Sequence, residues 1–157
     1  MGRKLLGLVA KRAELEAFAA EHALTAPLAL EQGFAFLALG DDDLDALVPP
    51  PSSRAQAGFA QWNDELRSVL ERSTRVGGLR ELLYLESDSF GGTTRQGVVL
   101  VRDGRVVRGP DSGGRGIVDG ALRVLGVRVV APALDAFESV GLERVRLRHH
   151  AHAPARL

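Results

Sequence analysis

Two carboxylates stand two residues apart where an apolar run approaches a pair of glycines. Glu86 and Asp88 precede Phe90, and Gln96 follows the glycines. In a strand, residues two apart share a face, so both carboxylates point the same way. Such a pair can transfer protons or hold a divalent cation. The competing interpretation is a solvated strand end beside a turn, and it is the favoured one because Asp and Glu are mostly exposed.

Other candidate motifs lack the partners that their chemistry needs. The glycine-rich run 113–116 precedes an apolar segment, but it matches neither a Walker motif nor Gly-x-Gly-x-x-Gly. His149, His150 and His152 cluster without an acidic or thiol partner nearby. We therefore expect no catalytic residue, no cofactor and no metal site.

The composition is that of a globular domain from a reducing compartment. The 157 residues include no cysteine, which excludes disulfides and thiolate metal sites and fits a cytoplasmic protein. No apolar run approaches the roughly 18 residues of a membrane span. The 20 basic and 20 acidic residues cancel, whereas a dedicated nucleic-acid binder is usually strongly basic. Neither a membrane nor a nucleic acid is an expected partner.

Hydrophobic periodicity predicts alternating strands and helices in the first half of the chain. The three consecutive prolines from Pro49 predict an extended linker, and Ser53 is the candidate N-cap of the longest helix. The predicted elements are strands at 5–10 and 34–39 and helices at 12–22, 41–47 and 53–73.

In the second half, Asp103-Gly104 between β-branched runs is the strongest hairpin signal, because a type I′ turn needs positive φ twice. Val101 is predicted to lie opposite Val106, and Leu100 opposite Val107. The remaining predicted elements are strands at 82–90, 96–102, 105–108, 127–130 and 144–148, a turn at 91–94, a flexible loop at 109–116, and helices at 117–125 and 132–137.

This order of elements predicts an α+β fold with a mixed, mainly antiparallel sheet and helices packed mostly on one face. We expect a single domain over residues 1–148. Its halves, about 1–48 and 53–148, are joined by the proline-rich linker 49–53, and residues 149–157 form a flexible tail.

The segment from Leu83 to Gly92, Gln96 and the run from Val98 to Val107 resemble a family of uncharacterised small bacterial proteins. In that family an acidic strand runs into Phe-Gly-Gly, a Gln follows, and a hairpin comes next. The first half is similar more loosely, with Ala38 and Gly40 where the pattern has Pro and Thr. The resemblance implies no activity, since none is known for the family.

The sequence predicts a substantial hydrophobic core and contains no recognisable catalytic motif. This combination favours a non-enzymatic protein that binds another macromolecule, most simply another protein. An immunity-type protein that neutralises a toxin fits this size and composition. The alternatives are a small enzyme or small-ligand binder, and a structural subunit. The oligomeric state stays open. The candidate binding residues are Glu86, Asp88, Phe90, Gly91, Gly92 and Gln96.

Overall fold

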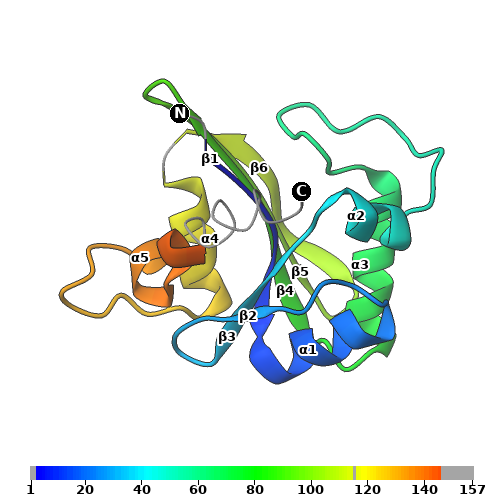
Figure 1. Ribbon diagram of the computed structural model, residues 1–157, viewed down its shortest axis with the longest axis horizontal. Helices are drawn as coiled ribbons and strands as arrows, with labels where there is room; N and C mark the ends of the chain where they lie inside the picture. The colour runs from blue at the N-terminus through cyan, green and yellow to red at the C-terminus, as the bar shows by residue number, and fades with distance from the viewer. Residues whose placement is uncertain (1–2, 115, 146–157) are drawn as a thin grey trace, which may run out of the picture.

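The computed structural model describes residues 3–114 and 116–145, which form one six-stranded sheet with helices on both faces (Figure 1). The strand order is β2-β3-β1-β4-β5-β6, and every pairing in the described part is antiparallel. The strands are β1 (Arg3–Lys11), β2 (Leu28–Ala29), β3 (Phe34–Ala38), β4 (Glu81–Phe90), β5 (Thr93–Arg102) and β6 (Arg105–Gly113). The helices are α1 (Arg12–Glu21), α2 (Asp41–Leu47), α3 (Asp64–Val76), α4 (Ile117–Leu125) and α5 (Ala136–Val140).

The central strand β1 joins the two halves of the chain, because it pairs with β3 on one side and with β4 on the other. Its side chains alternate between two hydrophobic cores. Leu5 and Val9 pack with α4 and α5, while Leu8 and Ala10 pack with α1 and α3. A strand buried on both faces reads as a nearly continuous apolar run, as this one does.

The predicted α+β class with a mainly antiparallel sheet is confirmed. The helices were expected to pack mostly on one face of the sheet, and the structure also places a layer of helices on the other face. Helices α1, α2 and α3 lie on one side of the sheet, and α4 and α5 cover the other (Figure 1).

The Asp103-Gly104 turn is confirmed, with φ values of 51° and 91°. Val101 lies opposite Val106 as predicted, but Leu100 pairs with Arg108 rather than Val107. An irregularity between Leu100 and Val101 shifts the register, as a β-bulge does by adding one residue to one strand. Strand β6 then continues to Gly113, through most of the segment predicted as a flexible loop.

Helix α3 begins at Asp64, so the predicted start at Ser53 is wrong. Asn63 is its N-cap, and its side-chain oxygen accepts from the amide of Leu66 at 2.9 Å. Ser53 instead donates its hydroxyl to the Glu65 carboxylate at 2.5 Å. The residues between α2 and α3 are not helical, and Phe59 and Trp62 among them pack against the sheet face that α1 and α3 cover.

Three predictions near the end of the described chain need correction. Residues 127–130 form no strand, since the amide of Arg128 bonds to the side chain of Gln32. The helix predicted from Pro132 begins at Ala136 instead, with Asp135 as its N-cap. Residues 142–145 are helical, which contradicts the start of the predicted edge strand, and 146–148 lie outside the described residues, as does the predicted tail. None of the described helices is long and apolar enough to span a membrane.

Candidate functional site

The Glu86 carboxylate is bound by backbone amides of the segment that precedes α3. It accepts hydrogen bonds from the amides of Ala60 at 2.6 Å, Gln61 at 2.9 Å and Trp62 at 3.3 Å. The hydroxyl of Tyr84 donates to the same carboxylate. Four donors from the protein itself therefore satisfy this anion, and charge-assisted hydrogen bonds of this kind are the strong ones.

Aromatic packing brings that segment onto the sheet. The indole of Trp62 is 1% exposed and lies 4.9 Å from the ring of Tyr84, centroid to centroid. The ring of Phe59 lies over Gly97 on the neighbouring strand β5. A Cβ at position 97 would stand 2.6 Å from that ring, so only glycine fits there without displacing Phe59.

Tyr84 is buried beneath this segment in the core that includes α1 and α3. Burial raises the pKa of its hydroxyl, and both the charge of Glu86 and the hydrogen bond to it raise the pKa further. The phenolate form is therefore strongly disfavoured in the folded protein.

Asp88 lies two residues further along the same face and has a different environment. It stands directly opposite Lys4 of β1 and Arg95 of β5, so the three side chains form a row across adjacent strands. All three are exposed, and within the described residues none of them forms an ion pair. The row therefore presents charges of both signs to solvent.

Phe90 ends β4 at the tip of the β4–β5 hairpin, and its residue surface is 70% exposed. Gly91 and Gly92 form the two-residue turn with φ values of 57° and 84°. Positive φ at both central positions is the requirement of a type I′ turn, which glycine meets without strain. The hairpin extends past both helical layers (Figure 1).

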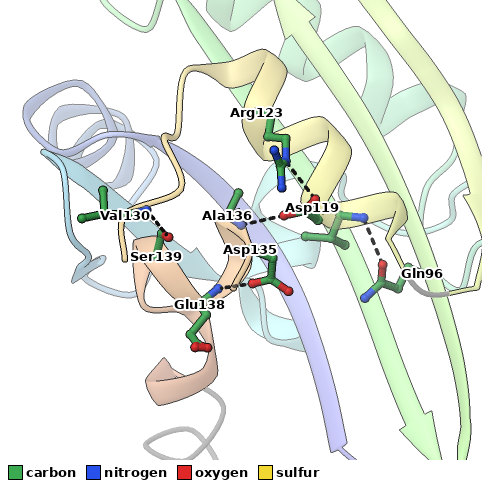
Figure 2. A network of polar contacts seen from close by, with 9 residues as sticks. Gln96, Asp119, Arg123, Val130, Asp135, Ala136, Glu138 and Ser139 are labelled. Carbon is green, nitrogen blue, oxygen red and sulfur yellow. Dashed lines mark hydrogen bonds and ion pairs between the residues drawn. The ribbon is translucent and has the colours of Figure 1, made fainter. Parts of the chain in front are cut away.

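Gln96 lies on the opposite face of the sheet, so the structure does not bring its side chain to the carboxylates. Its side-chain oxygen accepts from the amide of Val118 at 3.0 Å in the first turn of α4 (Figure 2). Its amide nitrogen lies 3.5 Å from the hydroxyl of Ser87. Gln96 therefore caps a helix, and of the predicted residues only Glu86, Asp88 and Phe90 share a face.

A cleft of about 420 Å³ lies beside Glu86, between α2 and the 58–61 segment. Leu6, Leu39, Leu44 and Phe59 contribute apolar lining. Lys4, Asp88 and Arg95 also line it, and the same three residues line a second, more open hollow of about 500 Å³ that reaches Phe90 and Thr93. The two hollows therefore adjoin along the charged row.

In this arrangement Glu86 and Asp88 do not act together as a pair of carboxylates. Glu86 is engaged by the 60–62 amides, which leaves Asp88 without a carboxylate partner for acid–base work. In residues 3–114 and 116–145, no group of three His, Asp or Glu side chains is placed to hold a metal ion.

Lys4 and Arg95 were missed among the sequence candidates. Counting from the turn finds Arg95, whereas Lys4 is placed by the pairing of β1 with β4, which no turn fixes. With 91 and 92 as a two-residue turn, Phe90 falls opposite Thr93 and Asp88 opposite Arg95. The prediction of a four-residue turn at 91–94 hid that pairing.

No family model, no curated protein and no solved structure matches the chain.

Replacing Glu86 by Ala should lower the free energy of unfolding by about 2–4 kcal/mol, because four donors lose their acceptor. Asp88→Ala is the matched control, two residues along the same strand face, and should change it by less than about 1 kcal/mol. Urea titration followed by Trp62 fluorescence measures both. Equal effects of the two substitutions would contradict the structural role of Glu86.

Tyr84 is the only tyrosine, so its titration can be read directly from tyrosinate absorbance. In urea it should titrate near pH 10, and in the folded protein it should stay protonated above that pH. Because the folded pKa is raised, the stability contribution is complete below about pH 10 and is lost as the pH rises further. Titration near pH 10 in the folded protein would contradict burial of the Tyr84–Glu86 pair.

Proposed function

We propose that this protein is non-enzymatic and binds another protein through the hairpin face. The hairpin face consists of Lys4, Asp88, Phe90, Thr93 and Arg95. The observation that carries the proposal is the exposure of Phe90, at 70%, on a hairpin that extends past the helical layers. Aromatic side chains are enriched at the centres of protein–protein interfaces, so a Phe exposed on an ordered hairpin can serve as the anchor of one.

The hairpin face has the composition of a binding hot spot with its rim. Phe90 can supply an apolar anchor, and the adjoining hollow of about 500 Å³ can accept a partner side chain. The row of Lys4, Asp88 and Arg95 supplies charges of both signs for orientation.

The backbone that carries these groups is already ordered by its pairing. Strands β4 and β5 pair without a break from Glu81 opposite Arg102 to Phe90 opposite Thr93. The side chains of Ser89 and Thr94 add a contact of 3.3 Å across the hairpin on the other face. A surface fixed before binding loses less conformational entropy when a partner arrives.

The environment of Glu86 supports binding over catalysis, because its carboxylate is committed to the protein's own amides. An immunity-type protein fits the proposal, since occluding a toxin needs a rigid exposed surface and no chemistry. We therefore propose that the protein is of the immunity type and that its partner is a toxin.

The second candidate function is small-ligand binding in the cleft of about 420 Å³, a volume in the range of small-molecule sites. Its apolar lining and charged mouth favour this candidate. Leu44→Trp separates the two, because it fills the cleft and leaves Phe90 unchanged. Full partner binding in Leu44→Trp with loss in Phe90→Ala supports the hairpin face, whereas the reverse pattern would place the binding site in the cleft.

The test introduces the photocrosslinking residue benzoylphenylalanine at position 90, in cells where the protein is native. Val76, 76% exposed at the end of α3, is the matched control position. We expect one protein to crosslink at position 90 and not at position 76. That protein is then purified, and its affinity for the wild-type chain and the variants is measured by calorimetry.

Phe90→Ala and Arg95→Ala should each weaken that binding about tenfold or more, with unchanged melting temperatures. Identical crosslinking at both positions would contradict the proposal, as would unchanged affinity in Phe90→Ala. A large fall in the melting temperature of Phe90→Ala would show instead that the side chain is structural.

A further inference from the structure

A second group of exposed hydrophobic residues lies at the connection between α4 and α5, remote from the hairpin face. Among the described residues, seven large hydrophobic side chains are exposed, and four of them fall between positions 124 and 134. Leu134 is 87% exposed and Val130 is 53% exposed. Single exposed hydrophobic residues are normal, but four of them within eleven positions of one connection make that connection the candidate interaction surface. The four residues are Val124, Val129, Val130 and Leu134.

The backbone of this connection is fixed at several points, so the exposed side chains do not belong to a loose loop. Arg128 exchanges two hydrogen bonds with the side chain of Gln32, at 2.7 and 2.9 Å. Further along, the amide of Val130 donates to the hydroxyl of Ser139 at 2.9 Å (Figure 2). The amide of Ala133 closes a turn onto the carbonyl of Val130 at 3.0 Å.

The α5 end of the connection is fixed as well. The amide of Ala136 donates to the carboxylate of Asp119 in α4 at 2.6 Å (Figure 2). Asp135 caps α5 through the amide of Glu138 at 2.8 Å. A preordered apolar surface loses little entropy on association.

The charges beside this surface are complementary to each other. In residues 116–145, Asp119 pairs with Arg123, and Arg144 pairs with Glu31. Arg128 and Glu138 remain as one cation and one anion whose side chains have no ion pair or hydrogen bond within the described chain. They lie on either side of Val130 and Leu134 in the chain.

We propose that this surface binds a second copy of the same chain and forms a twofold symmetric dimer. In such a dimer residue i contacts j and j contacts i, so Arg128 of each copy meets Glu138 of the other around an apolar centre. The formal net charge of zero removes long-range repulsion between copies. The dimer leaves the hairpin face free, because that face lies on the side of the sheet that α1–α3 cover.

Sedimentation velocity over a range of concentrations tests the proposal on the purified full chain. Wild type should dimerise, and Leu134→Asp should raise the dissociation constant about tenfold or more. Val76→Asp is the matched control, because Val76 is 76% exposed but lies on α3. It should dimerise like wild type. A wild-type chain that stays monomeric up to about 1 mM would overturn the proposal, as would equal effects of the two substitutions.

A charge exchange tests the predicted pairing independently of the apolar contact. Arg128→Glu and Glu138→Arg should each weaken the dimer, and the double variant should restore it toward wild-type affinity. Circular dichroism and melting curves check that each variant is folded. A double variant as weak as the single ones would overturn the twofold arrangement.

Discussion

The contact between the Glu86 carboxylate and the amides of residues 60–62 holds the non-helical segment before α3 against the sheet. That segment carries Trp62 into the core, forms one wall of the cleft and ends at the N-cap of α3. Without an acceptor at position 86, three amides and the hydroxyl of Tyr84 would lose their shared partner. One carboxylate thus fixes the 60–62 segment, and with it the start of α3, against strand β4.

The side chains on one face of β4 pass from core to solvent within a few residues. Tyr84 is fully buried, Glu86 is bonded to backbone, Asp88 is exposed between two cations, and Phe90 is exposed at the tip. The two ends of β4 therefore have different roles. Its buried half holds the molecule together, and its exposed half is free to contact a partner, which is where we place the function.

The elements that could be predicted from the sequence are those whose signals are local. Asp103-Gly104 fixes its own turn through positive φ, and the Gly at position 126 ends α4 in the same conformation. The face shared by Glu86 and Asp88 follows from strand alternation alone. Asn63 followed by two acidic residues is also a local helix start, and the expectation placed on Ser53 overlooked it.

The role of Glu86 could not be predicted, because its partners are backbone amides that any residue supplies. The same holds for Gln96, whose partner is the amide of Val118 on a helix more than twenty residues away. The second helical layer, by contrast, could have been predicted, because β1 reads as the nearly continuous apolar run of a strand covered on both faces. The contacts of Glu86 and Gln96 could not. Such contacts depend on how distant segments meet, which residue types do not encode locally.

Amide hydrogen exchange measured residue by residue tests most directly whether Glu86 holds residues 60–62 in place. Ala60 and Gln61 have exposed side chains in a segment without regular structure, so their amides would ordinarily exchange fast. The structure predicts that the amides of Ala60, Gln61 and Trp62 are protected, and that Glu86→Gln accelerates their exchange while leaving the Asp103-Gly104 turn unchanged. Fast exchange of the three amides in the wild-type protein, or protection that survives in Glu86→Gln, would contradict it.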